Sequence, residues 1–303
     1  MPKSISLTDI ARLAQVTPAT VSNALKGKKN VSDKTREKIL AIAKAHHYHP
    51  NMAAQGLRAR HSKLIAVLLH DFQNVFTSEI ADEINQALEA RGYSMVAIAN
   101  NSENLLNSHL FDGLIVFNYH STRDHLEEIV TTAGLPTVIM AAELALPNVE
   151  NVVMANREPV EELCRLFART DHQKVCVLRG PQDSYNSDTR WAAVHDYFLT
   201  HYHRDLTPDT YDAEFTSAPA YAQALRLLKE HRYDFFFCLN DMMAYGVYQA
   251  ASELGLTVGK ALSVVGYDNT QHHIDIFKPA LTTVDPNMHR RGEMIAESVV
   301  ARL

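Results

Sequence analysis

The segment from Leu7 to Lys26 carries small polar side chains where a helix would face outward. Its inward positions, Val16, Val21 and Leu25, are apolar. A helix without bulky side chains on its outer face can enter a groove of DNA, where hydroxyl and amide groups reach phosphates and base edges. The side chains that could do this chemistry are Thr17, Pro18, Ala19, Thr20, Ser22 and Asn23.

Two short helices joined by a tight turn must position this face. Either Ser6 or Thr8 can cap the first helix, and Thr17 can cap the second. Pro18 then takes the first helical position, where its missing N–H costs nothing, and Gly27 is expected to end the helix. The apolar positions of the first helix recur at helical spacing and are Leu7, Ile10, Ala11 and Ala14.

A third helix is predicted from Ser32, and the chain around its start is basic. Residues 1–63 hold 12 Lys and Arg against three acidic residues, whereas the remainder holds 17 basic against 32 acidic residues. A head of net charge +9 on a body of −15 is typical of a nucleic-acid binder whose body stays away from the phosphates. The alternative is a basic face that merely contacts solvent. The side chains that can reach phosphates are Lys28, Lys29, Lys34, Arg36 and Lys38.

The segment YHPNMAAQGLRARHS follows, and Pro50 separates it from the third helix. Asn51 can cap a short helix, MAAQGLR, which has almost no apolar face and is expected to be marginal alone in water. One interpretation is a disordered linker. The other is a hinge that becomes helical only on DNA.

The composition excludes several classes of protein. No apolar run reaches the roughly 20 residues of a membrane span, and the N-terminus lacks the apolar segment of a secretory signal. The cysteines Cys164, Cys176 and Cys238 form no CxxC pair, which fits a reduced cytoplasmic protein with core cysteines. The 16 histidines lack zinc-finger and HExxH spacing, and there is neither a P-loop nor a GxSxG motif. We therefore expect no metal, no cofactor and no enzymatic activity.

From Lys63 onward, short apolar strands alternate with amphipathic helices in two series. This pattern predicts two α/β lobes with parallel sheets covered on both faces, and a ligand site beyond the carboxyl ends of the strands. The predicted strands are 64–69, 95–99, 113–117 and 137–141, then 174–178, 234–239 and 262–266. The predicted helices are 77–91, 123–133, 158–169, 188–200, 218–230 and 241–254, followed by an amphipathic stretch from Met288 to Leu303.

These motifs together resemble the lac repressor (LacI/GalR) family of bacterial transcriptional regulators. Residues 6–60 contain L-T-D-I-A-R-L-A-x-V-T-x-x-T-V-S-x-A-L, V-S-x-K-T-R-E-K-I and Y-H-P-N-x-A-A-Q-x-L-R. The body contains DGLIVF, LNDMMAYG, VVGYDN and PALTTV. The resemblance implies an all-α helix-turn-helix headpiece plus an α/β two-lobed periplasmic-binding-protein-like sensor body.

The sequence departs from the family pattern at two places that bear on the fold. Gln15 stands where the family usually has Gly in the turn, so a left-handed backbone there would cost some stability. Between Asn101 and Asp112 the chain has only SENLLNSHLF, where the family usually has a longer loop and a full helix. Most of one helix of the N-terminal lobe is therefore expected to be missing.

The resemblance also implies that a homodimer binds a near-palindromic double-stranded DNA operator. Pro18, Ala19 and Asn23 would read bases, and of these Asn23 can form paired hydrogen bonds, with adenine. Leu57 would insert into the minor groove and kink the duplex. The implied phosphate contacts are Thr17, Thr20, Ser22, Asn30, Ser32 and Thr35, and the further implied DNA contacts are Ser6, Leu7, Thr8, Asn51, Ala54 and Arg58.

A small effector, a sugar or related metabolite, is implied between the two lobes. Arg190, Asn240 and Asp268 offer a fork of donors, an amide and an acceptor, which suit a polyhydroxylated or heterocyclic ligand. Phe76 and Phe215 can stack on a ring, although each could equally be a core aromatic. The implied site residues are Asp71, Val75, Phe76, Ser184, Asn186, Arg190, Phe215, Asn240 and Asp268, and none of them demands a phosphorylated ligand.

We predict a helix-turn-helix domain over 1–50, a hinge helix and linker over 51–63, an N-terminal lobe over 64–155 plus 285–303, and a C-terminal lobe over 156–284. A transport-type solute-binding protein would share the body but not the basic head. An enzyme of sugar metabolism would need an acid/base pair or a nucleophile motif. An activator or a corepressor-dependent regulator of the same family stays open, as does the identity of the effector.

Overall fold

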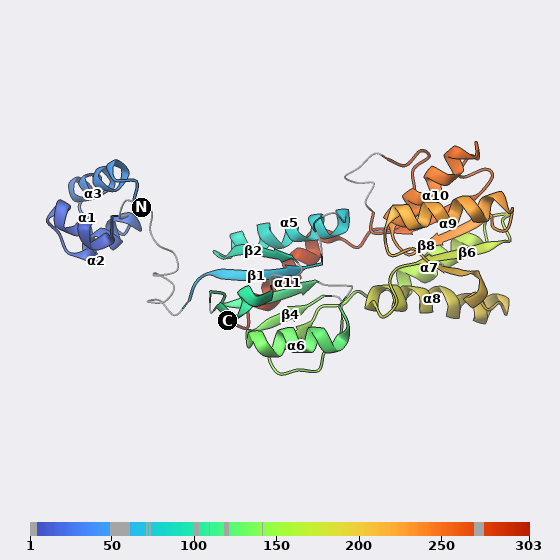
Figure 1. The fold of residues 1–303 in the computed structure, drawn as a ribbon, viewed down its shortest axis with the longest axis horizontal. Helices are drawn as coiled ribbons and strands as arrows, with labels where there is room; N and C mark the ends of the chain where they lie inside the picture. The colour runs from blue at the N-terminus through green and yellow to red at the C-terminus, as the bar shows by residue number, and fades with distance from the viewer. Residues whose placement is uncertain are drawn as a thin grey trace. The chain divides into compact units, whose positions relative to one another are not determined.

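The computed structural model describes residues 5–48, 61–70, 72, 74–99, 103–108, 110–117, 121–140, 142–269 and 276–303. The chain forms two compact units, Met1–Ser62 and Lys63–Leu303. The first is all-α and the second is an α/β body (Figure 1), which confirms the expected fold class for each. None of the helices in these ranges combines the length and the apolar character needed to cross a membrane.

Three capped helices build the head, namely α1 (Leu7–Ala14), α2 (Pro18–Leu25) and α3 (Asp33–Ala45). Ser6 caps α1 in a reciprocal capping box with Asp9, which decides between the two cap candidates. Thr17 caps α2 with Pro18 at its first position, and Ser32 caps α3. The small core that the helices share contains Ile10, Val21 and Ile39, all of them fully buried.

The turn between α1 and α2 passes through a left-handed residue. Gln15 has φ 58° and ψ 46°, and its N–H donates to the carbonyls of Ala11 and Arg12 to close the helix. A side chain with a Cβ is strained in this conformation, which glycine adopts freely. The left-handed Gln15 therefore lowers the stability of the head, as expected from the sequence.

Two basic side chains of α3 contact the head's own backbone. Arg36 donates to the carbonyl oxygens of Lys28 and Val31, at 2.7 and 3.3 Å. Lys38 donates to the carbonyl oxygen of Ala14 at 2.9 Å. In the structure these two side chains hold the loop before α3 and the end of α1, and their contact with phosphates stays a prediction.

The first sheet of the body is parallel throughout, with the order β2-β1-β3-β4-β5. Its strands are β1 (Leu64–Leu69), β2 (Ser94–Ala99), β3 (Gly113–Phe117), β4 (Thr137–Ile139) and β5 (Val149–Asn151). Its helices are α5 (Val75–Ala90), α6 (Arg123–Ala133) and α11 (Met288–Val300), with the short 3-10 helix η1 (Glu103–Ser108).

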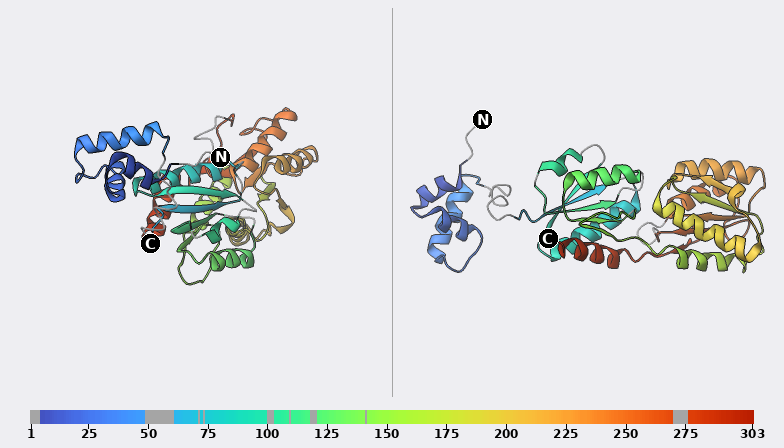
Figure 2. Two further views of the ribbon diagram at one scale, coloured as in Figure 1. Left: turned by 60° about the vertical axis from the view of Figure 1, so that its left-hand side comes forward. Right: turned by 90° about the horizontal axis from the view of Figure 1, so that it is seen from below.

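Alternate residues of these strands face two different layers. Ile65, Val67 and Leu69 belong to the core under α5 and α11, whereas Ala66 and Leu68 belong to the core under α6 and η1. Figures 1 and 2 show α5 on one side of the sheet and α6 on the other. Within the segment SENLLNSHLF, the described residues 103–108 form η1, and Leu106 and Phe111 pack into the core of this layer.

The second sheet is also parallel, with the order β10-β9-β8-β6-β7. Its strands are β6 (Val175–Arg179), β7 (Thr210–Asp212), β8 (Phe235–Cys238), β9 (Ser263–Tyr267) and β10 (Thr282–Val284). Its helices are α7 (Arg157–Phe167), α8 (Tyr185–Tyr202), α9 (Ser217–Lys229) and α10 (Asp241–Glu253), with the 3-10 turn η2 (Thr207–Asp209). In Figure 1, α9 and α10 cover one face and α7 and α8 the other.

The left-handed turn of the head predicts a stabilising substitution. Gln15→Gly should stabilise the head by about 0.5–1 kcal/mol, because relief of the backbone strain exceeds the extra entropy of a glycine in the unfolded chain. Hydrogen exchange of the α2 and α3 amides in the full chain would measure the change. Gln15→Ala, which keeps a Cβ, should give no gain, and equal protection in the Gly variant and the parent would contradict the account.

Candidate functional site

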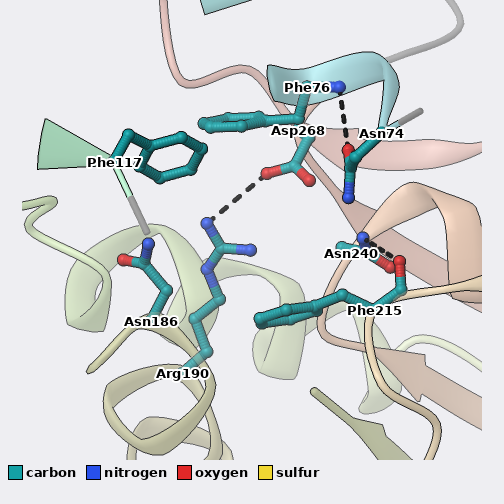
Figure 3. Close-up of a pocket in the computed structure, with 8 residues that line it drawn as sticks. All are labelled: Asn74, Phe76, Phe117, Asn186, Arg190, Phe215, Asn240 and Asp268. Carbon is teal, nitrogen blue, oxygen red and sulfur yellow. Dashed lines mark hydrogen bonds and ion pairs between the residues drawn. The ribbon is translucent and has the colours of Figure 1, made fainter. Parts of the chain in front are cut away.

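A cavity lies where the carboxyl ends of both sheets meet the first turns of three helices. It encloses about 320 Å³ of space outside the protein atoms, including its open mouth. Figure 3 shows the rings of Phe76 and Phe117 on one side and that of Phe215 on the other, with a guanidinium and a carboxylate between them. The lining residues are Asn74, Phe76, Phe117, Asn186, Arg190, Phe215, Asn240 and Asp268.

Arg190 is the most heavily used side chain of the cavity. Its Nε donates to Asn156 Oδ1 at 3.2 Å, and its Nη1 donates to the carbonyl oxygen of Leu239 at 2.7 Å. Its Nη2 lies 3.4 Å from Asp268 Oδ1, and the guanidinium stacks 3.6 Å from the ring centre of Tyr267. These contacts come from three parts of the chain, so they hold the guanidinium in one orientation before any ligand arrives.

Asp268 and Phe215 occupy strained backbone. Asp268 follows β9 with φ 113°, and Phe215 follows β7 with φ 56°. Such conformations cost about 1–3 kcal/mol each and cluster at functional sites. Gly180 makes room for the aromatic ring, because a Cβ there would lie 2.4 Å from ring atoms of Phe215. The backbone strain at Asp268 and Phe215 thus lowers stability but fixes the positions of the Asp268 carboxylate and the Phe215 ring.

Amide side chains at helix starts complete the wall. Asn240 caps α10 by accepting from the N–H of Met243 at 2.9 Å, and its amide nitrogen donates to the carbonyl oxygen of Phe215 at 3.0 Å. Asn74 caps α5 by accepting from the N–H of Phe76 at 3.0 Å. Because the helices begin at the cavity, the positive ends of their dipoles point toward it.

Two carboxyl groups near the cavity have raised pKa values. Burial raises the pKa of Asp268 to about 6, although the positive charges of Arg190 and Arg291 oppose the rise. Burial also raises the pKa of Glu79, on α5, to about 7, and the negative charge of Asp268 adds to that rise. Both groups therefore change charge close to neutral pH, and the polarity of the cavity responds to pH.

The structure brings six of the nine predicted effector-site residues together: Phe76, Asn186, Arg190, Phe215, Asn240 and Asp268. Val75 and Ser184 do not line the cavity. Val75 is half-buried at the start of α5, and Ser184 is buried at the cap position of α8. Asp71 lies outside the described residues. The roles of all nine stay predictions.

Two lining residues were not predicted. Phe117 is the last residue of β3, and Asn74 is the cap of α5. The rule that ligands lie beyond strand ends could have indicated Phe117, because GLIVF was recognised as a strand. Nothing in the residues around Asn74 separates a lining amide from an ordinary cap.

The head presents the predicted DNA-facing residues on the surface of α2 and at helix starts. Thr17, Pro18 and Ala19 are exposed, and Asn23 is half-buried. The hydroxyl oxygens of Thr17 and Thr20 lie 2.9 Å apart, and those of Ser32 and Thr35 lie 2.8 Å apart. Ser6, Thr8 and Asn30 are exposed and Leu7 and Ser22 are half-buried, whereas Asn51, Ala54, Leu57 and Arg58 lie outside the described residues.

Comparisons with known proteins agree along nearly the whole chain. Residues 6–51 match "Bacterial regulatory proteins, lacI family", and residues 164–303 match "Periplasmic binding protein-like domain". The chain is 26% identical to the sucrose operon repressor of Pediococcus pentosaceus, over 98% of this chain and 92% of that protein.

Solved structures share the fold. A lac repressor dimer bound to operator and the anti-inducer ONPF superposes with a TM-score of 0.84 at 25% identity, covering 98% of this chain and 92% of that one. A complex of the transcriptional regulator CelR with cellobiose gives a TM-score of 0.70 at 25% identity, covering 98% of this chain and 93% of that one.

The raised pKa of Glu79 predicts a pH-dependent stability. The folded state favours the protonated carboxyl, so the stability that Glu79 contributes is present below its unfolded pKa and is lost as the pH rises through about 7. Glu79→Gln should therefore be more stable than the parent at about pH 8, on the order of 1–2 kcal/mol after allowance for solvent screening. At about pH 5 the difference should be small.

Denaturant unfolding of the full chain at both pH values would measure this. Glu89→Gln, which changes an exposed carboxylate of the same helix, is the matched control and should leave the pH profile unchanged. If Glu79→Gln destabilised the chain equally at both pH values, the carboxyl would not titrate as described.

Proposed function

We propose a function on one premise: the chain belongs to the lac repressor (LacI/GalR) family of bacterial transcriptional regulators. It is a sequence-specific DNA-binding regulator, with repression as the expected sign. Its affinity for an operator is controlled by a small effector in the cavity at the strand ends. The observation that carries this function is the presence, in one chain, of a capped helix-turn-helix head and a preorganised polar cavity lined by eight residues.

The head is assigned to DNA by charge and by shape. Its net charge of +9 attracts phosphates, and α2 offers an outer face of short side chains that a groove can accept. Asn23 is the side chain of this face that can form paired hydrogen bonds with a base edge. We propose Thr17, Thr20, Ser22, Asn30, Ser32 and Thr35 as phosphate contacts, because hydroxyl and amide groups at helix starts lie beside free backbone N–H groups.

The segment after the head is proposed as the switched element. Residues 51–58 include Leu57, which we propose inserts into the minor groove at the operator centre, flanked by Ala54 and Arg58. Two copies of this segment are needed for a near-palindromic site, so we propose a homodimer. In the lac repressor dimer that the chain resembles, operator and anti-inducer are bound together.

The body is assigned to a small polar ligand. Arg190, Asn240 and Asp268 give directional donors and acceptors, and the rings of Phe76, Phe117 and Phe215 give flat apolar surfaces. A sugar or a related metabolite has matching hydroxyls and ring faces. CelR, one of the structural relatives, is seen with cellobiose. We propose no catalytic role and a cytoplasmic location, and the division into 1–50, 51–63, 64–155 plus 285–303, and 156–284 as functional domains.

Base reading by Asn23 gives a direct test of the head. Asn23→Ala should lose discrimination at a single base position in each half-site, by roughly 1–3 kcal/mol, because only that amide pairs with a base edge there. An operator selected from a random duplex library, followed by a panel of single-base variants, would measure this. Ser22→Ala is the control. It should weaken binding to all sequences evenly and leave the salt dependence unchanged, because the lost hydroxyl carries no charge. If Asn23→Ala kept the base preference of the parent at every position, the proposed role of Asn23 in base reading would be wrong.

Ligand screening by thermal unfolding tests the cavity. A ligand at about 100 times its Kd stabilises by roughly 2.7 kcal/mol, which is about 5–10 °C for a unit of this size. Arg190→Gln and Asp268→Asn should each abolish most of the shift given by any ligand so found. Arg165→Ala, at an exposed arginine of α7, should keep it in full. A full shift in both cavity variants would place the ligand elsewhere.

A further inference from the structure

Arg291 is a buried arginine whose charge has no ion-pair partner among the residues that the structure describes. It lies on α11, its side chain is 7% exposed, and its Nη1 has no hydrogen-bond partner within the described ranges. No ion pair of Arg291 within 4.0 Å is found there either. Its neighbours on the buried stripe of α11, Ile295 and Val299, are apolar. Packing alone would be served by an apolar residue at this position.

The cost of this arrangement cannot be relieved by loss of a proton. Taking a charged group out of water costs several kcal/mol when nothing pairs with it. Burial lowers the pKa of Arg291 to about 10, with the positive charge of Arg190 adding to the fall, so the guanidinium still stays charged at neutral pH. Arg291 is not one of the eight lining residues, but it interacts electrostatically with Arg190 and Asp268, which are. Its unpaired buried charge therefore calls for an explanation at this site.

The neighbouring charges do not neutralise Arg291. The groups that interact with it electrostatically are Arg190 on α8 and Tyr267 and Asp268 on β9 and just after it. Asp268 is already in contact with Arg190, at 3.4 Å. Glu79 on α5 is the other acid near Asp268, and its pKa of about 7 leaves it partly protonated. Arg190 and Arg291 therefore share the carboxylate of Asp268, which contacts Arg190, and two guanidiniums carry more positive charge than this carboxylate balances.

Other buried hydroxyls lie on the helices that begin at the cavity, although they do not line it. Thr77 on α5 and Ser187 on α8 are fully buried, and their hydroxyls have no hydrogen-bond partner among the described residues. Ser184, at the cap position of α8, is in the same situation. The helices α5, α8 and α10 all begin at the cavity and add the positive ends of their dipoles. The buried acceptor Asp268 Oδ1 also lacks a hydrogen bond among the described residues, so the region holds unsatisfied polar groups of both kinds beside these positive helix ends.

The backbone of Arg291 is fixed against α5. A Cβ at the next residue, Gly292, would lie 2.7 Å from Glu83, so the two helices approach closely at this point. The same helix α5 carries Phe76, which lines the cavity. The close packing of α11 on α5 therefore fixes the backbone of Arg291, and its side chain is buried.

We propose that the effector carries an anionic group, a carboxylate or a phosphate, and that the Arg291 guanidinium binds it beside Arg190 and Asp268. This rests on the proposed function, since it names the ligand class of the same cavity. A sugar acid and a sugar phosphate share the chemistry that Arg291 recognises. The neutral part of the ligand keeps the contacts with Asn240, Asp268 and the aromatic rings.

The first test uses inorganic phosphate and the full chain. Thermal unfolding is followed with rising sodium phosphate at constant ionic strength, for the parent, Arg291→Met, Arg291→Lys and Arg290→Met. The exposed Arg290, on the same helix, is the matched control. Phosphate should raise the unfolding temperature of the body in the parent and in Arg290→Met, raise it less in Arg291→Lys, and leave Arg291→Met unshifted. Equal shifts in the parent and Arg291→Met overturn the proposal.

Arg291→Met has a second expected effect without any ligand. It should unfold at the same or a higher temperature than the parent, because an apolar side chain of similar length replaces a buried unpaired charge. A structural role for Arg291 would instead make the variant less stable. This separates loss of anion recognition from loss of folding.

A second test decides between the two sources of the anion. D-glucose, D-glucuronate and D-glucose 6-phosphate, and the same triad built on D-galactose, are titrated into the parent and Arg291→Met. One acidic member should bind about 10–100-fold more tightly than its neutral parent sugar, as a charged hydrogen bond provides, and Arg291→Met should remove that preference. Neutral sugars that bind as tightly as both acidic forms overturn the proposal.

Operator binding distinguishes failure of this inference from failure of the proposed function. Arg291→Met should keep the sequence-selective DNA binding of the parent, because the head is unchanged. If DNA binding is selective but the anion response is the same in Arg291→Met, only the inference fails. If the full chain shows no sequence-selective DNA binding, the proposed function fails, whatever the anion does.

Discussion

One buried guanidinium organises the ligand cavity. Arg190 contacts Asn156 at the connection between the two sheets, the carbonyl of Leu239 at the end of β8, and Asp268 and Tyr267 at the end of β9. These partners lie at the carboxyl ends of parallel strands, where the chain turns into the next helix. A change in how the ends of the strands lie would therefore change the hydrogen bonds of Arg190. The position of the Arg190 guanidinium thus links the shape of the cavity to the arrangement of the strand ends.

Several features that lower the stability of the body lie at or near the cavity. Asp268 is buried with a raised pKa and strained backbone, and Phe215 has positive φ. Arg291 is buried, and its Nη1 has no hydrogen-bond partner in the part of the chain that the structure describes. Elsewhere the body follows ordinary rules, with apolar strands, alternating layers and capped helices. Concentrated strain and unpaired polarity are expected where binding, and not folding, decides the residue.

Much of this organisation follows from the sequence, and the rest fails for physical reasons. The long apolar runs LIAVLL and GLIVF predicted β1 and β3 with their observed bounds. The strands β5, β7 and β10 were missed because each has three residues, and VEN, TYD and TTV are too polar and too short to show an apolar run. Phe117 and Arg291 could not be assigned from spacing, since each depends on which chain segments the fold brings together. The apolar spacing from Met288 to Leu303 predicted the helix α11, but it could not predict the surroundings of the buried Arg291.

The central claim is that the cavity and the DNA-reading head are two coupled sites of one chain. Thermodynamic linkage makes that coupling reciprocal. The most direct measurement is therefore the affinity of the full chain for its selected operator with and without saturating ligand, together with the affinity for that ligand with and without operator. The account predicts that both affinities change by the same factor, about 5–150-fold. A ligand that binds the cavity equally well with and without operator, and leaves operator affinity unchanged, would contradict it.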